Sequence, residues 1–225
     1  SLYTARCAEF VTKEGQQKGI EICKKHGIDG LVVIGGDGSL SGARVLAQEF
    51  DLPCIGIPAT IDNDICCTNY SIGFDTAANT AIECIDKLRD TMQSHERCSI
   101  VEVMGRNAGY LAMYVGLAVG ATAVIVPEDP FDFNEDIVEK IRRARLNGFT
   151  HYMIVVAEGA VSALEISQKI KQELEMLAIR YLDPIGYNEV KTDIEKKYGI
   201  PIVNKRVSVT PISLVGGKLP TIIVD

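Results

Sequence analysis

The chain alternates short apolar runs with longer stretches of helical periodicity. Apolar runs predict strands at 31–34, 54–57, 98–103, 123–126 and 152–157. The run at 31–34, LVVI, is β-branched and uninterrupted, so we expect a strand that is buried on both faces of a sheet. A helical pattern separates each strand from the next, and this alternation favours parallel strands joined by right-handed crossovers.

Helices are predicted at 12–26, 41–50, 75–92, 134–146 and 162–174, and in the small-residue stretch that ends at Val119. The clearest periodicity is in 75–92, where Ala81, Ile85, Leu88 and Met92 share one face. Asp75 is placed to cap the N-terminus of this helix. The predicted fold class is therefore α/β, with a doubly wound, mostly parallel sheet and helices on both faces.

Four polar or glycine-rich clusters come directly after predicted strands. They are GGDGS at 35–39, PATIDND at 58–64, MGRNAGY at 104–110 and the pair Glu158 and Gly159. Ligands of parallel sheets bind beyond the carboxyl ends of the strands. We therefore expect these clusters to share one edge, where they would form a binding site.

The glycines of GGDGS allow backbone amides to turn toward a phosphate, although a tight turn between strand and helix explains the motif equally well. A carboxylate beside a phosphate would repel it unless a cation lies between them, so Asp37 is interpreted as a Mg²⁺ contact. Thr60, Asp62 and Asp64 suit a general base with orienting partners, or alternatively a helix cap or turn. Together, the clusters predict a phosphoryl-transfer site.

Composition narrows the possible partners. The 225 residues suffice for one large or two small domains, and 47% hydrophobic with 24% charged residues is ordinary for a globular protein. A formal net charge of −7 argues against nucleic acid or an anionic membrane as partner. No apolar run approaches the ~20 residues that span a bilayer. The start at Ser1 has no signal peptide and no initiator Met, so we expect a processed or excised start.

The seven cysteines include no Cys-x-x-Cys motif, so the sequence indicates neither a zinc site nor a disulfide framework. We expect reduced, mostly buried thiols.

Seven segments resemble the 6-phosphofructokinase family, in its order and close to its spacing. They are TARC at 4–7, GGDGS, PATIDND, IGFDTA at 72–77, SHER at 94–97, VEVMGR at 101–106 and VAEG at 156–159. The resemblance runs from about Ser1 to about Leu174. We therefore expect a phosphofructokinase-like nucleotide and sugar-phosphate domain over 1–174 and a divergent segment of uncertain fold over 175–225.

The resemblance implies transfer of a phosphoryl group from ATP to the 1-hydroxyl of fructose 6-phosphate, with Mg²⁺, by a cytoplasmic, allosteric homotetramer. It makes Asp62 the catalytic base, supported by Thr60 and Asp64, and Arg106 the cation on the reacting phosphoryl group. The nucleotide and its Mg²⁺ would contact Arg6, Cys7, Gly36, Asp37, Gly38 and Ser39, with Asp37 at the metal.

For the sugar phosphate, the resemblance implies contacts from Met104, Gly105 and Arg106, and from Glu158 to the sugar hydroxyls. Arg97 would be lent by a neighbouring subunit to the phosphate of the sugar. Arg89 and Gly120 fall where the bacterial family binds a nucleotide effector.

The chain also departs from the family. The family's first strand with its Gly-Gly-Asp-x-Pro-Gly loop does not precede Ser1, and its later Gly-His-x-Gln-Arg-Gly-Gly clamp is absent after about Glu175. Residues 198–212 instead resemble a different bacterial family. We therefore expect weak sugar binding and impaired turnover, and two alternatives stay open: an inactive ligand-binding or regulatory relative, and a pyrophosphate-dependent phosphofructokinase. Gly38 and Ala59 favour ATP as the donor, since the resemblance implies Asp and Lys at these two positions in the pyrophosphate-dependent relatives.

Overall fold

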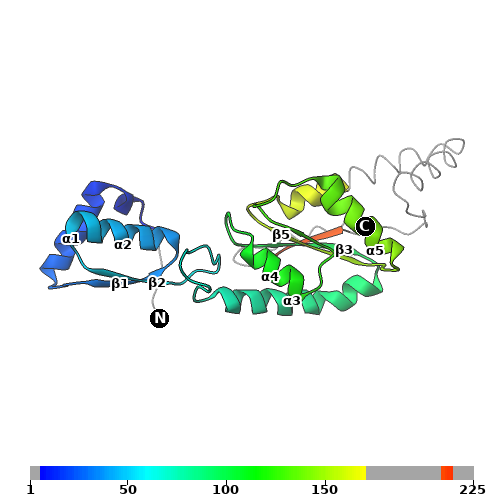
Figure 1. Cartoon of the computed structure of the whole chain (residues 1–225), viewed down its shortest axis with the longest axis horizontal. Coiled ribbons are helices and arrows are strands. Elements are labelled where there is room, and N and C mark those ends of the chain that lie inside the picture. Colours follow the sequence, from blue (N-terminus) through cyan, green and yellow to red (C-terminus); the bar gives the residue numbers. More distant parts are fainter. Residues whose placement is uncertain (1–5, 171–208, 215–225) are drawn as a thin grey trace, which may run out of the picture. The chain divides into compact units, whose positions relative to one another are not determined.

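The computed structural model describes residues 6–170 and the backbone of 209–214. The chain divides into two compact units (Figure 1). Unit 1 comprises 1–60 and 64–73, and unit 2 comprises 61–63 and 74–225. All strand pairs in both units are parallel, and helices pack on the strands, which confirms the predicted α/β class.

Unit 1 is a small strand–helix–strand module. Its elements are the 3-10 helix η1 (Ala8–Val11), α1 (Lys13–Lys25), β1 (Leu31–Gly35), α2 (Asp37–Phe50) and β2 (Cys54–Pro58). The two strands pair in register from Leu31 opposite Cys54 to Gly35 opposite Pro58. In Figure 1, α2 lies along this strand pair.

Local signals fix the ends of α1. The Thr12 hydroxyl accepts a 3.1 Å hydrogen bond from the Gly15 amide, as an N-cap residue does. At the other end His26 is the C-cap, and Gly27 has a φ of 65°, a conformation that glycine adopts without strain. Ile20 of α1 packs with Leu46 in a small core.

Unit 2 contains a larger sheet. Its elements are α3 (Phe74–Ser94), β3 (Cys98–Val103), α4 (Tyr110–Ala118), β4 (Ala123–Ile125), the π-helix η2 (Asn134–Val138), α5 (Glu139–Leu146), β5 (Tyr152–Ala157), a helix at 163–170 and β6 (Val209–Leu214). The strand order is β4-β5-β3-β6, so the chain winds from β3 toward β4 and later returns past β3 to β6. This reversal is the predicted doubly wound topology.

Helices cover both faces of this sheet. One core joins α3 and α4 to the strands through residues such as Ile85, Leu111 and Val155. The other joins η2 and the helix at 163–170 to the opposite face, through Ile137, Ile154 and Ile166. Because β5 is fully buried and β3 nearly so, the sheet forms the rigid centre of unit 2. None of the helices in the described ranges is long and apolar enough to cross a membrane.

Several sequence predictions of the fold need correction. The strands form a two-stranded and a four-stranded sheet rather than one sheet. Strand β1 is not buried on both faces, because Val32 and Ile34 are 62% and 59% exposed. Helices in unit 1 pack on one face of β1, so its side chains alternate in burial although all of them are apolar.

Helix boundaries also differ from the predictions. Helix α2 begins at Asp37 instead of Ser41, so most of GGDGS is helical rather than a loop. Asp75 lies inside the first turn of α3, which begins at Phe74, so it is not the cap. The apolar stripe of α3 is confirmed by the burial of Ala81, Ile85 and Met92.

All seven cysteines are free, as predicted, but the expectation that most are buried is wrong. Cys98 alone is buried, while Cys7, Cys66 and Cys67 are exposed. Free thiols on loops need no core position to stay reduced, which is why the count of cysteines could not predict their burial.

The C-terminal segment contributes strand β6, which pairs in parallel with β3 at the edge of the sheet. Pro211 lies within β6, and an edge strand tolerates proline because one side of its backbone needs no partner. The boundary predicted near Leu174, like the end of the helix predicted at 162–174, lies outside the described residues.

Candidate functional site

The carboxyl end of β1 leads directly into the N-terminus of α2. Gly36 is the N-cap, and no side chain caps the helix there. The first amides of α2, from Asp37, Gly38 and Ser39, are thus the kind of donors that bind phosphate at a helix N-terminus. The carboxylate of Asp37 is exposed and makes no hydrogen bond or ion pair among the described residues.

The turn after β2 lies beside this helix start. The Ala59 amide donates a 2.9 Å hydrogen bond to the Gly35 carbonyl, which continues the ladder of β1 and β2 past their ends. A Cβ on Gly36 would lie 3.2 Å from Cβ of Thr60. Within unit 1, the structure therefore brings together the two clusters that contain Asp37 and Thr60, as the sequence predicted.

Two features of the glycines shape this part of the site. A Cβ on Gly35 would lie 2.7 Å from the Ser39 hydroxyl oxygen, so Gly35 allows the close packing of Ser39 over the end of β1. Gly38 has no atom within 4 Å of the position that a Cβ would take, so the surface at Gly38 itself is open. Such open space beside several amides suits a ligand of some size.

Arg6 and Cys7, the other predicted nucleotide contacts, precede η1 and are exposed. No hydrogen bond or ion pair links them to 36–39 in the part of the chain that the structure describes. Their assignment to the nucleotide therefore stays a prediction.

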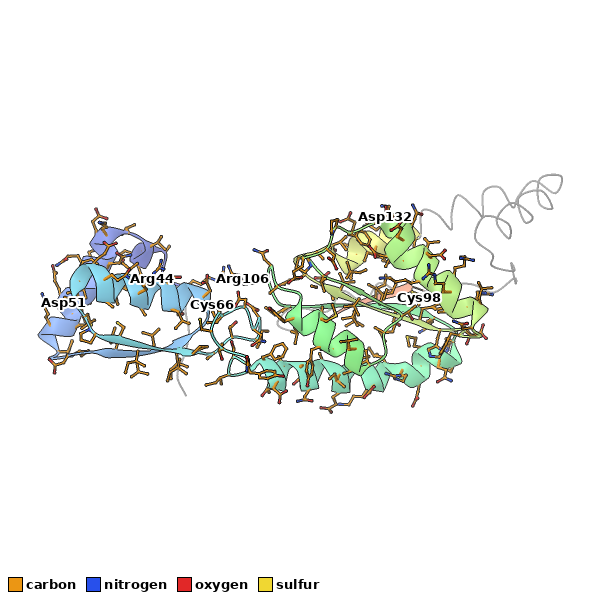
Figure 2. All side chains as sticks on the ribbon, viewed as in Figure 1. Arg44, Asp51, Cys66, Cys98, Arg106 and Asp132 are labelled. Atoms are coloured by element: carbon orange, nitrogen blue, oxygen red, sulfur yellow. The ribbon has the colours of Figure 1, made fainter. Side chains whose placement is uncertain are left out.

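In unit 2, the loop after β3 contains the next cluster. Gly105 has a φ of 143° and Arg106 a φ of 52°, so the chain turns sharply just after the strand. The Ala108 amide closes the turn with a 2.9 Å hydrogen bond to the Gly105 carbonyl. Figure 2 labels Arg106, whose side chain is exposed.

The loop after β5 contacts this turn directly. The Arg106 amide donates a 2.8 Å hydrogen bond to Oε1 of Glu158. A Cβ on Gly159 would lie 1.9 Å from the Arg106 carbonyl oxygen, so the two loops pack with backbone against backbone. Since β3 and β5 pair from Cys98 opposite Tyr152 onward, adjacent strands deliver Arg106 and Glu158 to one edge. The structure thus brings together these two predicted residues, with Met104 and Gly105.

Asp62 and Asp64 differ in environment. Asp62 is 8% exposed and is grouped with unit 2, whereas Asp64 is exposed and belongs to unit 1. A buried carboxylate next to a ligand site suits proton transfer better than an exposed one, because less water competes for it. The catalytic role of Asp62 stays a prediction.

Arg97 lies apart from the other predicted residues of unit 2. It precedes β3, whereas Met104 to Arg106 follow the strand, and a strand of six residues spans about 20 Å. Its Nε atom is buried and has no hydrogen-bond partner within the described ranges. Arg97 and Arg106 of one chain therefore do not meet at the same edge.

The predicted effector residues do lie together. An Nη atom of Arg89 donates a 2.7 Å hydrogen bond to the carbonyl of Val119, which precedes Gly120. Gly120 is exposed and has a φ of 63°, a backbone conformation that favours glycine.

Sequence reasoning missed Glu128. Its Oε1 accepts a 2.8 Å hydrogen bond from the amide of Gly109, the N-cap of α4, so it fixes the helix that follows the Arg106 loop. A Cβ on Gly109 would lie 2.5 Å from the other carboxylate oxygen of Glu128. Its position in the sequence could have indicated it, because Glu128 comes shortly after β4, just as the other clusters come after their strands.

In the described residues, no group of three or more His, Cys, Asp or Glu side chains could hold a metal ion by itself. Mg²⁺ needs no such group, since it commonly binds one or two carboxylates plus phosphates and water. Asp37 is an exposed carboxylate at a helix N-terminus whose amides could bind phosphate, so it is suited to contact a Mg²⁺ ion that arrives with a nucleotide.

Comparison with known proteins places these residues in context. A family model described as phosphofructokinase matches residues 1–194. A protein named ATP-dependent 6-phosphofructokinase from Thermoanaerobacter pseudethanolicus is 55% identical over 180 residues, which cover 80% of this chain and 56% of that protein. A protein of the same name from Bacillus pumilus is 54% identical over 175 residues, covering 78% of this chain and 54% of that protein. The chain thus spans about half the length of these relatives.

Among solved structures, phosphofructokinase from Saccharomyces cerevisiae is similar to 94% of this chain, with a TM-score of 0.65 and 29% identity, although the match covers 28% of that chain. The family match ends before β6, whose residues 209–214 lie beyond residue 194.

Proposed function

Because the chain belongs to the phosphofructokinase family, we propose that it carries the site for transfer of the γ-phosphoryl group of ATP to the 1-hydroxyl of fructose 6-phosphate. One observation carries this proposal. Within each unit, the clusters that match the family lie together at the carboxyl edge of the strands, Thr60 beside Gly36 in one unit and Arg106 beside Glu158 in the other.

Each chemical requirement of phosphoryl transfer has a candidate residue. The buried Asp62 would accept the proton of the attacking hydroxyl group. The exposed guanidinium of Arg106 would offset the negative charge that spreads over the transferred group. Amides of 37–39 would bind phosphate oxygens, and Asp37 would hold Mg²⁺. When bound, Mg²⁺ neutralises charge on the phosphates.

Glu158 would contact the sugar while its Oε1 also accepts the Arg106 amide hydrogen bond. A carboxylate has about four lone-pair sites, so it can accept from the Arg106 amide and from sugar hydroxyls at once. This bond would fix the position of Arg106 relative to the sugar-binding carboxylate. Enzymes catalyse phosphoryl transfer mainly by positioning the reacting groups and by stabilising their charge, so such a fixed position matters.

The proposed donor is ATP rather than pyrophosphate. The open space at Gly38 leaves room for the rest of a nucleotide next to the helix N-terminus, whereas an Asp there would crowd it. Titration of the chain with ATP and with pyrophosphate, each with Mg²⁺, tests this. Tighter binding of pyrophosphate would reverse the assignment.

We further propose that the active species is an oligomer, a homotetramer by family resemblance, in the cytoplasm. The position of Arg97 at the opposite end of β3 from Arg106 supports a role in a neighbour's site, and its buried, unpartnered Nε supports a ligand or partner there. Arg89 and Gly120 would bind a nucleotide effector, since Arg89 lies at an exposed glycine turn with an accessible guanidinium.

The test of function is a coupled assay that follows ADP formation with and without fructose 6-phosphate. We expect ADP formation that depends on both the sugar phosphate and Mg²⁺. A chain that binds Mg-ATP by calorimetry but forms no ADP would instead be a ligand-binding or regulatory relative.

A further inference from the structure

The loop after β2 carries two adjacent cysteines that the proposed function does not use. Cys66 and Cys67 form a turn, and both residues are exposed. Cys67 has a φ of 66°, a left-handed conformation that is uncommon for a residue with a side chain. Neither thiol makes a hydrogen bond in the described part of the chain, and Figure 2 labels Cys66 in this loop.

Adjacent cysteines are poorly placed for a disulfide bond with each other. Neighbouring Cα atoms are about 3.8 Å apart, whereas disulfides usually join Cα atoms about 4.4 to 6.8 Å apart. A bond outside this range is strained and is easily reduced. The pair is therefore expected to persist as two free thiols, as the structure shows it.

One larger atom can bridge the two sulfurs with less strain. Sulfur–zinc bonds are about 2.3 Å long, so two sulfurs on one such tetrahedral centre are roughly 3.7 Å apart, compared with about 2.05 Å in a disulfide. Thiolates select soft ions. The described residues contain no group of three or more His, Cys, Asp or Glu side chains that could hold a metal ion. We therefore consider a bridging centre that needs only two sulfurs from the protein.

We propose that Cys66 and Cys67 form a chelating site for a soft, thiophilic metalloid centre of the arsenic(III) class. With an organic arsenic(III) oxide, two S–As bonds form, and the oxide oxygen leaves as water with the two thiol protons. No electrons are transferred. The proposal goes beyond the proposed function and uses none of its residues.

Two of the other cysteines compete poorly for such a centre. Cys98 is enclosed in the sheet of unit 2, where burial raises the pKa of its thiol to about 12, so it provides little thiolate. Cys7 is exposed but has no adjacent cysteine. Chelation by two linked thiols typically binds 100- to 10,000-fold tighter than either alone, an estimate from effective concentration.

The experiment treats the reduced full chain with phenylarsine oxide and measures adducts by native mass spectrometry and peptide mapping. We expect one phenylarsenic group per chain on the peptide that contains Cys66 and Cys67, released by a dithiol but not by a monothiol. Cys66→Ser and Cys67→Ser should each weaken capture by at least about 100-fold. The matched control Cys7→Ser, which removes an exposed single thiol, should capture the phenylarsenic group as tightly as the wild type does.

Three results would overturn the proposal. They are an adduct mapped to other cysteines of the wild-type chain, capture that survives in either serine variant, and no capture at all. Mapping on the wild-type chain does not depend on how the variants fold. Since no readout involves ADP formation, the result is independent of the proposed phosphoryl transfer.

Discussion

The Arg106 amide donates a 2.8 Å hydrogen bond to Oε1 of Glu158, a residue 52 positions later in the chain. The bond joins the turn after β3 to the turn after β5. Arg106 has a φ of 52°, and this conformation aims its amide at the carboxylate while its guanidinium stays exposed. Strained backbone at such a junction is typical of functional sites, where the surroundings hold a costly conformation.

Gly159→Ala tests the packing of these two loops. A Cβ at position 159 would lie 1.9 Å from the Arg106 carbonyl oxygen, so the loops must separate. We expect a loss of about 1 to 3 kcal/mol in the free energy of unfolding, the usual range for overpacking, measured by denaturant unfolding. Gly38→Ala is the matched control, because its Cβ would meet no atom within 4 Å. Equal stability of Gly159→Ala and wild type would contradict the observed packing.

Asp62→Asn tests the proposed role of Asp62 as the general base. The amide of asparagine cannot accept the proton, so turnover should fall by at least about 100-fold, the usual span for loss of such a group, with Mg-ATP binding nearly unchanged. The coupled assay and calorimetry measure these two quantities. Intact turnover would show that another group removes the proton.

Arg97 provides a test of a site shared between subunits. Loss of a charged hydrogen bond of about 1.5 to 3 kcal/mol predicts that Arg97→Ala raises the KM for fructose 6-phosphate by about 10- to 150-fold. If Arg97 serves a neighbour's site, mixing and reassembling Arg97→Ala with Asp62→Asn chains should restore part of the activity, because some sites then receive both native residues.

The unmixed variants, subjected to the same reassembly, are the control for that experiment. Wild-type specific activity should also fall on dilution. A mixture no more active than the sum of its components, or a fully active monomer by sedimentation, would refute the shared site.

The stability of the chain should depend on pH through Glu139. Hydrogen bonds from Arg142 and Arg143 lower the pKa of Glu139 from 4.5 to about 2. Because the folded pKa is depressed, this stabilisation is fully present above pH 4.5 and is lost as pH falls toward about 2. The carboxylate is near water, so the effect should be modest and should weaken in high salt.

Thermal unfolding between pH 2 and 5 measures this pH dependence of stability. Glu139→Gln should show a smaller fall in Tm over this window than wild type. Identical pH profiles for the two chains would mean that the ion pairs of Glu139 contribute nothing to stability.

The sequence by itself determined most of the segments that become strands and helices, because this information is local, but it did not predict β6. The ends of β3 and β5 coincide with the predicted runs. β5 is a continuous apolar segment between His151 and Glu158, and β3 is mainly apolar although it includes Ser99 and Glu102. It also determined that Gly36, Thr60, Arg106 and Glu158 follow strands, which is enough to place each of them at a carboxyl edge.

Only the tertiary structure decided which strands pair and which residues meet. The sequence of an apolar strand does not specify which strand pairs with it. Residues 98–103 and 209–214 alone therefore could not predict the division into two sheets or the pairing of β6 with β3. The same holds for the Arg106 bond to Glu158 and for the support that Glu128 gives Gly109. Each depends on contacts between residues distant in sequence, which form only when the sheet brings their strands side by side.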